Sequence, residues 1–211
     1  MGTDDTVIRG CTFRNFDTRK SGVIEVHGED VRVEDNLFEN ISSSTSTSAV
    51  FVLTANGGPA SVTGNTFKEV HRALTSYTGG VIVNRNVVEG SADMAIVCQG
   101  DGCLVEGNLI SGATTAGVWV SGKDNKVLNN MITDTVVDSD GYGSIRVRGG
   151  IADVRGNQIV LNEPNPNALA IRVDAESDVT FLKNNIARGY AIPSIKFHGE
   201  YTGFVSDNIE E

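Results

Sequence analysis

Three cationic side chains recur at the centre of one short pattern, in which a cation stands between two apolar residues. The copies are Ile145-Arg146-Val147, Ile171-Arg172-Val173 and Ile195-Lys196-Phe197. A row of fixed cations can bind a polyanion, and it can neutralise a carboxylate while a base removes a neighbouring proton. This chemistry requires the three side chains to share one face, so it depends on the elements that carry them.

An asparagine-centred pattern repeats along the whole chain and sets the register of those elements. It recurs about every 24 to 25 residues, a period typical of solenoids. We expect the side chains to stack as a ladder in tight turns, because Asn tolerates the left-handed conformation and can bond the next amide. The predicted ladder is Asn36, Asn65, Asn86, Asn108, Asn130, Asn157 and Asn184, with Cys11 and Asp207 in the terminal copies.

Each repeat also carries an alternating apolar element before its Asn, such as Ile24-Glu25-Val26, and helical periodicity is missing. Three short strands that always run in the same direction around the coil predict parallel stacking. We therefore predict an all-β fold, a single-stranded right-handed parallel β-helix (solenoid) of about nine coils, as one domain over residues 1–211. No capping element is visible, so we expect a fragment of a longer protein, or end-to-end or oligomeric packing.

Composition restricts the classes of partner and site. A net charge of −10 and a pI near 4.7 argue against nucleic acid, and no apolar run is long enough for membrane insertion. We expect Cys98 and Cys103 to be buried free thiols, with a disulfide across their turn as the alternative. No Cys or His cluster has metal-ligand spacing. We expect an extracellular or cell-surface location, although no signal peptide opens the chain.

The coil pattern of all 211 residues resembles the pectate-lyase-like right-handed β-helix superfamily. The stretches 7–16 and 31–38 are similar to the early coils of alginate lyases and chondroitinase-B-like lyases. The resemblance implies that a Lys and an Arg from neighbouring coils face a uronic-acid substrate, with Ca²⁺ assisting in many members. The Asn-Lys-Ser and Arg-His-Gly neighbourhoods of these lyases are absent here, as is the Asp-Pro-His motif of mannuronan epimerases.

The repeat register predicts that the three cations share one outward column. In a lyase-like scheme the catalytic residues are Arg146, Arg172 and Lys196. They neutralise the uronate carboxylate, and Lys196 or an arginine is the base that removes the C5 proton. Trp119 and Arg148 bind substrate. The alternative is that nearby acids neutralise the stack while the aliphatic stems cover the sheet. These acids are Asp174, Glu176 and Asp178. The earlier members of the column are Glu25, Phe51 or Val52, Thr75 and Val97.

Two further motifs are weaker. Asp138-Ser139-Asp140-Gly141 resembles half of a calcium loop, so Asp138 and Asp140 are candidate Ca²⁺ ligands, with a solvated turn as the alternative. His27 and His198 stand in matching His-Gly-Glu stretches near opposite ends of the solenoid, and we expect them to be turn residues.

Two functional hypotheses remain open. In the first, the chain is a carbohydrate-directed β-helix that binds an acidic polysaccharide and cleaves it by β-elimination, or only binds it. In the second, it is a non-catalytic structural or adhesive segment of a surface or spike protein. The cationic column favours the first hypothesis, whereas the missing lyase motifs and missing caps favour the second.

Overall fold

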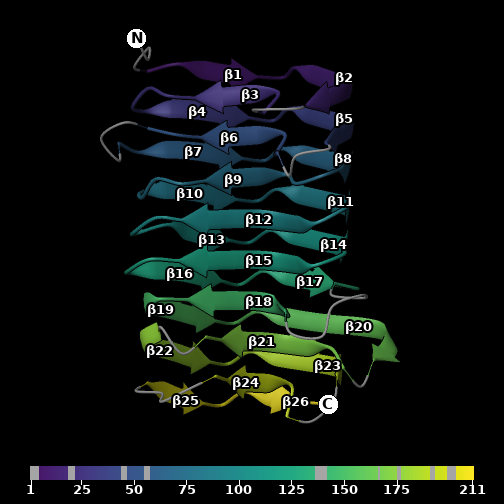
Figure 1. Cartoon of the computed structure of the whole chain (residues 1–211), viewed down its shortest axis with the longest axis vertical. Helices are drawn as coiled ribbons and strands as arrows, with labels where there is room; N and C mark the ends of the chain where they lie inside the picture. Colours follow the sequence, from purple (N-terminus) through teal and green to yellow (C-terminus); the bar gives the residue numbers. More distant parts are fainter. Residues whose placement is uncertain are drawn as a thin grey trace.

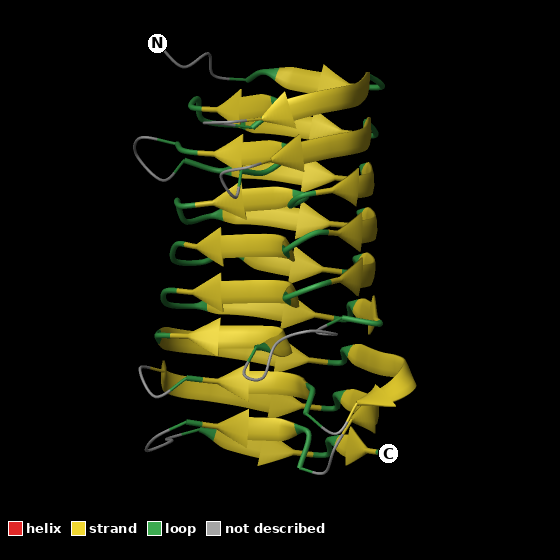
Figure 2. Cartoon of the chain, turned by 45° about the vertical axis from the view of Figure 1, so that its right-hand side comes forward, coloured by secondary structure: helices red, strands yellow, loops and turns green. Residues whose placement is uncertain are grey.

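The computed structural model describes residues 5–18, 22–43, 47–54, 58–135, 142–165, 167–174, 177–190, 193–198 and 203–211. These residues form 26 β-strands and no helix, so none of them belongs to a helix that could cross a bilayer. The strands wind into a right-handed parallel β-helix (Figures 1 and 2). The predicted fold class is confirmed.

The strands belong to three parallel sheets. Sheet A contains β1 (Val7–Arg9), β4 (Val31–Glu34), β7 (Ala60–Thr63), β10 (Val81–Asn84), β13 (Leu104–Glu106), β16 (Asn125–Leu128), β19 (Gly150–Arg155), β22 (Ser177–Lys183) and β25 (Phe204–Ser206). Sheet B contains β2 (Thr12–Thr18), β5 (Leu37–Ser43), β8 (Thr66–Val70), β11 (Val87–Ser91), β14 (Leu109–Ala113), β17 (Met131–Thr133), β20 (Gln158–Asn165), β23 (Ile186–Tyr190) and β26 (Ile209–Glu210). Sheet C contains β3 (Ile24–Val26), β6 (Val50–Val52), β9 (Leu74–Ser76), β12 (Met94–Gln99), β15 (Ala116–Ser121), β18 (Gly143–Arg148), β21 (Leu169–Val173) and β24 (Ile195–Phe197).

Each turn of the solenoid takes one strand from sheet C, then one from sheet A, then one from sheet B. In the described residues, eight such three-strand turns follow β1 and β2, slightly fewer than the nine predicted coils. Equivalent residues pair from turn to turn, as Val83 does with Val62 and Val105. Because equivalent residues pair, a residue type that recurs at the same position of each repeat forms a column along the solenoid.

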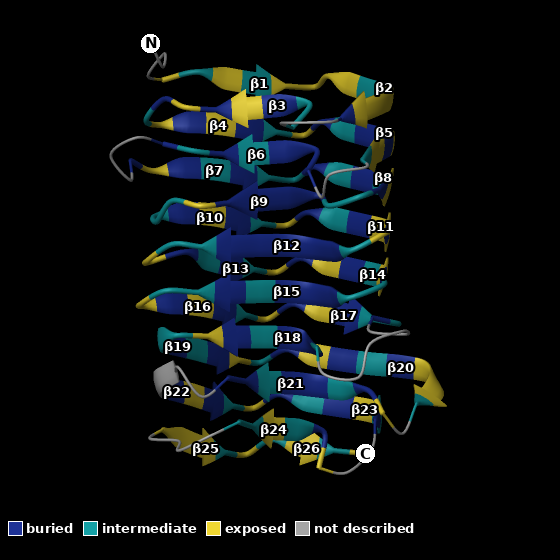
Figure 3. Ribbon diagram, in the orientation of Figure 1, coloured by how far each residue is buried: buried dark blue, intermediate teal, exposed yellow. Residues whose placement is uncertain are grey.

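The core is the narrow interior that the three sheets enclose, and Figure 3 shows buried residues alternating with exposed ones along the strands. Alternate side chains of each strand point inward, because successive residues of a strand face opposite sides. In sheet B the rings of Phe13, Phe38 and Phe67 stack at centroid distances of 4.9 and 4.8 Å. Phe38 and Phe67 are fully buried, so the aromatic stack anchors the first turns of the core.

The asparagine ladder runs along the turn between sheets A and B. The main-chain nitrogen and Nδ2 of Asn86 each donate to Oδ1 of Asn108 at 3.0 Å, and Nδ2 also donates to the Val62 carbonyl at 2.8 Å. The same pattern confirms the predicted ladder positions Asn36, Asn65, Asn86, Asn108, Asn130 and Asn157. The ladder satisfies buried amides that the tight turn leaves without sheet partners.

The prediction was wrong at the last two ladder positions. The seventh ladder residue is Asn185, not Asn184, and Asn185 bonds in turn to Asn208 rather than to Asp207. Asn184 and Asp207 instead have φ values of 55° and 54°. The left-handed conformation therefore belongs to the residue before the ladder Asn. A pattern of residue types does not separate the two positions here, because Asn and Asp suit both. At the other end, the main-chain nitrogen of Cys11 donates to Oδ1 of Asn36.

Candidate functional site

The predicted cationic column is present on the outer side of sheet C. β15, β18, β21 and β24 pair in parallel, and Trp119, Arg146, Arg172 and Lys196 are consecutive partners across them (Figure 1). Earlier in the same column the strand register selects Phe51 over Val52. We call the surface formed by Trp119, Arg146, Arg148, Arg172 and Lys196 the cationic face.

A shared carboxylate holds the two arginines of this face in place. Asp174 accepts hydrogen bonds from Nε of Arg146 at 2.8 Å and from Nε of Arg172 at 2.6 Å. The three side chains are only 10–20% exposed. Burial alone raises the pKa of the Asp174 carboxyl, but the hydrogen bonds and charges of Arg172 and Arg146 outweigh burial and lower the pKa below its usual value. Asp174 is therefore ionised at neutral pH, as the neutralising alternative predicted.

Two aromatic rings enclose the guanidinium of Arg146. Its Cζ atom lies 4.6 Å from the ring centroid of Tyr142 and 5.2 Å from that of Trp119. Both distances suit a cation–π interaction. The rings pack on a small apolar cluster, formed on the outer side of the sheet by Met94, Val97 and Ala116. Arg146 is therefore a rigid, partly covered charge. The indole Nε1 of Trp119 has no hydrogen-bond partner.

Lys196 and Arg148 are the exposed cations of the cationic face. His198 lies beside them, because it follows β24 at the position where Asp174 follows β21. Burial lowers the pKa of His198, and the charges of Arg172, Lys196 and Arg146 lower it further against the opposing effect of Asp174. The imidazole is thus neutral at pH 7, and its Nε2 has no hydrogen-bond partner.

The sequence predicted that His198 lies in a turn, and it did not predict that His198 lies beside the cations. Its position two residues after Lys196 was the available signal, because residues two apart in a strand share a face.

Several predicted residues lie outside the part of the chain that the structure describes. These are the candidate Ca²⁺ ligands Asp138 and Asp140 and the acid Glu176, and the side chain of Asp178 is also not described. Within the described residues no group of three or more His, Cys, Asp or Glu could hold a metal ion. Cys98 and Cys103 are both buried free thiols, so no disulfide joins them.

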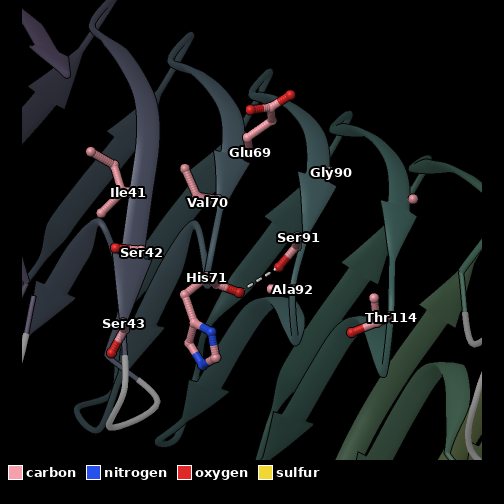
Figure 4. A pocket seen from close by; sticks show the side chains of 11 residues that line it. Ile41, Ser42, Ser43, Glu69, Val70, His71, Gly90, Ser91, Ala92 and Thr114 are labelled. Carbon is pink, nitrogen blue, oxygen red and sulfur yellow. Dashed lines mark hydrogen bonds between the residues drawn. The ribbon is translucent and has the colours of Figure 1, made fainter. Parts of the chain in front are cut away.

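A pocket of about 440 Å³ lies over the ends of β5, β8, β11 and β14, where sheet B turns toward sheet C (Figure 4). Glu69 lies at one end of the pocket, and the imidazole of His71 lies at the other end, near Ser43. Gly90 and Gly112 line the pocket without side chains. Sequence reasoning missed this pocket, because its residues match no motif and only the coiling brings them together.

A partly buried ion pair lies beside the imidazole of His71 in this pocket. Arg72 donates to Asp93 through Nε at 2.7 Å, and the two side chains are 14% and 17% exposed. His71 Nε2 lies 3.8 Å from Asp93 Oδ2, too far for a hydrogen bond, and it has no other partner. Burial lowers the pKa of His71, Asp93 opposes the shift and Arg72 adds to it. The imidazole is therefore neutral at pH 7.

The coil architecture agrees with a family match. Residues 1–203 match the family described as "Periplasmic copper-binding protein (NosD)". This chain belongs to the NosD family. No curated protein matches its sequence.

The fold of this NosD-family chain is similar to those of several solved structures. The Azotobacter vinelandii Mannuronan C-5 epimerase AlgE6 A-module has a TM-score of 0.67 at 14% identity, with 97% of this chain and 57% of that chain covered. The AlgE4 A-module of the same organism has a TM-score of 0.56 at 16% identity, with coverages of 94% and 64%. The Siphovirus 9NA tailspike receptor binding domain has a TM-score of 0.51 at 11% identity, with coverages of 99% and 46%.

The NosD-family chain therefore spans between 46% and 64% of the length of these structures. At such identities the likeness shows the fold, and it confirms the resemblance to pectate-lyase-like parallel β-helices. The fold alone assigns no role to the candidate residues.

Proposed function

We propose that this NosD-family chain binds an acidic polysaccharide on the cationic face. The observation that carries the proposal is the charge of the four strands beneath it. β15, β18, β21 and β24 contain four cationic residues and no acidic one, and Asp174 follows directly after β21. A net positive surface in a protein with a net charge of −10 is a specific arrangement, and it would attract an anionic chain.

The residues of the cationic face would contribute to binding in different ways. Arg146 and Arg172 are already oriented by Asp174, so they supply positive charge without a further loss of side-chain freedom. Lys196 and Arg148 are exposed and can pair with carboxylates of the ligand. Adjacent strands lie about 4.8 Å apart, so the column presents charges at regular intervals along the solenoid. Trp119, one strand before Arg146 in the column, offers an aromatic surface to a sugar ring.

The names of the similar proteins support a carbohydrate ligand and an external location. Two of them are epimerases of mannuronan, and a third is a receptor binding domain of a viral tailspike. The family description includes the word periplasmic. We infer a periplasmic or extracellular location for this chain on that basis, in line with the extracellular or cell-surface location expected from the sequence.

Cleavage by β-elimination is the enzymatic version of the proposal. A base removes the C5 proton of a uronic acid residue, and the arginines stabilise the negative charge that develops on its carboxylate. The C4–C5 double bond forms as the C4–O4 bond breaks, and the leaving O4 takes a proton from the protonated base or from water. The sequence predicted that Lys196 or an arginine is this base. The neutral imidazole of His198 is the better candidate, because it can accept a proton at neutral pH without first losing one. A binding face without this reaction is the alternative, and it suits an adhesive role.

The family description also names copper. Protein copper sites use clusters of His, Cys and Met ligands. Among the residues that the structure describes, no group of three or more His, Cys, Asp or Glu has the arrangement that a metal ion requires. We therefore assign no copper site to these residues and no step to copper.

A charge-matched pair of double variants tests the binding proposal. Arg148→Ala with Lys196→Ala removes the two exposed cations of the cationic face. Arg32→Ala with Lys126→Ala removes two exposed cations from one outward column of sheet A. We expect affinity for alginate or polygalacturonate, measured by calorimetry at low salt, to fall about tenfold or more in the first variant and less than about twofold in the second. Equal losses in both variants would refute a localised site.

The enzymatic version has a separate readout. Alginate, pectate and chondroitin are incubated with the protein, with and without Ca²⁺, and the absorbance of unsaturated uronate products is followed. A signal that His198→Gln abolishes supports β-elimination. Absence of any signal, with binding retained, leaves an acidic-polysaccharide binding protein.

A further inference from the structure

The pocket over β5, β8, β11 and β14 is a second candidate site, separate in chemistry from the cationic face. Its volume of about 440 Å³ falls in the range of about 300–1,000 Å³ that is typical of small-molecule sites. The residues that line it include one acid, Glu69, one histidine and several hydroxyl side chains, but no Lys or Arg. An anionic ligand would therefore meet a carboxylate without a compensating cation.

Glu69 occupies a strained backbone position. One position of the sheet B strands is left-handed in most turns, at Asn15, Asn40, Glu69, Gly90, Gly112, Asp134 and Gly189, whereas Leu161 of β20 does not have positive φ. The left-handed conformation suits Gly, Asn and Asp but is costly for a longer side chain. Glu69 has φ of 50° and is the exception in this series. A strained residue at the edge of a pocket points to a role that Gly or Asn would not serve.

The next two members of the series leave space beside the Glu69 side chain. Gly90 has φ of 72° and Gly112 has φ of 68°, so both positions favour glycine for their backbone conformation. Both residues line the pocket, and their lack of side chains keeps this wall of the pocket open to a ligand. Glu69 is thus next to Gly90, and Gly112 is next to Gly90 on the following strand.

The remaining polar groups suit hydroxyl ligands. Ser42 and Thr114 line the pocket and can both donate and accept hydrogen bonds. The neutral imidazole of His71 also carries one donor and one acceptor nitrogen, of which Nε2 is shielded from solvent beside Asp93. This set matches a polyol, whose hydroxyls donate to a carboxylate and exchange hydrogen bonds with hydroxyls and imidazole.

We propose that this pocket binds a neutral sugar residue, whose hydroxyls donate hydrogen bonds to the Glu69 carboxylate. The site is independent of the acidic polysaccharide on the cationic face. It gives the chain two glycan-binding regions of opposite charge, one on sheet B in the N-terminal half and one on sheet C in the C-terminal half.

The test uses the amide resonances of Gly90 and Gly112, which report on the pocket directly. The full chain is titrated with cellohexaose, β-1,4-mannohexaose and laminarihexaose, and with an oligogalacturonate as the anionic comparison. We expect at least one neutral hexasaccharide to shift both amides at millimolar concentration, and the oligogalacturonate to leave them unchanged. No shift with any neutral hexasaccharide, or stronger shifts with the oligogalacturonate, would overturn the proposal.

Two substitutions of Glu69 separate binding from folding. Glu69→Gly removes the carboxylate and relieves the left-handed strain, so we expect affinity for the active hexasaccharide to fall at least about tenfold while Tm rises about 2–4 °C. Glu69→Gln keeps the length of the side chain, and we expect a similar loss of affinity. Wild-type affinity in either variant would remove the role assigned to the carboxylate.

Asn40→Gly is the matched control. Asn40 occupies the equivalent left-handed position one turn earlier and does not line the pocket. We expect wild-type affinity for the hexasaccharide in this variant. A comparable loss of affinity in Asn40→Gly would show that the effect arises from the backbone of sheet B and would overturn the assignment.

Discussion

The guanidinium of Arg146 and the carboxylate of Asp174 meet at 2.7 Å, although 28 residues separate them in the chain. The contact forms because Arg146 pairs with Arg172 one strand along, and Asp174 lies two residues after Arg172. One carboxylate thus offsets the repulsion of two stacked guanidinium groups. It thereby keeps a cationic column stable in sheet C.

Replacement of the shared carboxylate should destabilise the fold. Asp174→Asn leaves two neighbouring guanidinium groups without their acceptor charge in a mostly buried position. We expect the free energy of unfolding to fall by about 3 kcal/mol, as measured by urea denaturation. Glu39→Gln breaks the more exposed pair with Arg14 and should cost less than about 1 kcal/mol. Similar costs in both variants would contradict the structural role of Asp174.

Replacement of Asn185 and replacement of the adjacent Asn184 should have very different effects on stability. Asn185→Ala removes an acceptor of two hydrogen bonds from Asn157 and a donor to the Val154 carbonyl. We expect it to lower the free energy of unfolding by about 3 kcal/mol, because buried amides are left unpaired. Asn184→Gly should change it by less than about 0.5 kcal/mol, since glycine accepts positive φ readily. The reverse order in urea denaturation would place Asn184 in the ladder.

Tyr190 should resist ionisation in the folded protein. Burial raises its pKa to about 12, and hydrogen bonding with Ser144 and Thr135 opposes this shift. The folded pKa is above the unfolded value of about 10, so this contribution to stability is present below pH 10 and is lost as pH rises toward 12. We expect tyrosinate absorbance from Tyr190 to appear only with unfolding. Tyr190→Phe should remove the loss of unfolding free energy that Tyr190 causes between pH 10 and pH 12. An unchanged dependence of the unfolding free energy on pH in this variant would contradict the assignment.

The three cysteines should differ in reactivity. Cys11 is exposed, whereas Cys98 and Cys103 are buried free thiols. The hydrogen bond with Cys103, together with burial, raises the pKa of the Cys98 thiol. We expect a thiol reagent to modify one cysteine in the native protein and all three in denaturant. Cys11→Ser should abolish the native reaction. A native reaction that persists in Cys11→Ser, or fewer than three thiols in denaturant, would contradict the burial or the free state of the pair.

The fold could be predicted because the residues that determine it repeat at regular intervals in the sequence. One apolar residue at each inward position and one Asn in each turn recur along the chain, so register follows from counting. The same counting placed Trp119, Arg146, Arg172 and Lys196 in one column. It failed at Asn184 and Asp207, where the backbone conformation of two adjacent residues, rather than their types, decides which one enters the ladder.

The amino-acid sequence by itself determined the architecture, the ladder over most of its length and the alignment of the cations, because each is a local pattern repeated turn after turn. Tertiary structure alone decided that one carboxylate clamps two arginines, that Tyr142 covers Arg146, and that His198 joins the cationic face. It also decided that Glu69, with its left-handed backbone, lies beside Gly90 of the next turn. These relationships depend on the distances and side-chain directions that coiling imposes between residues far apart in the chain, which residue types and spacing do not specify.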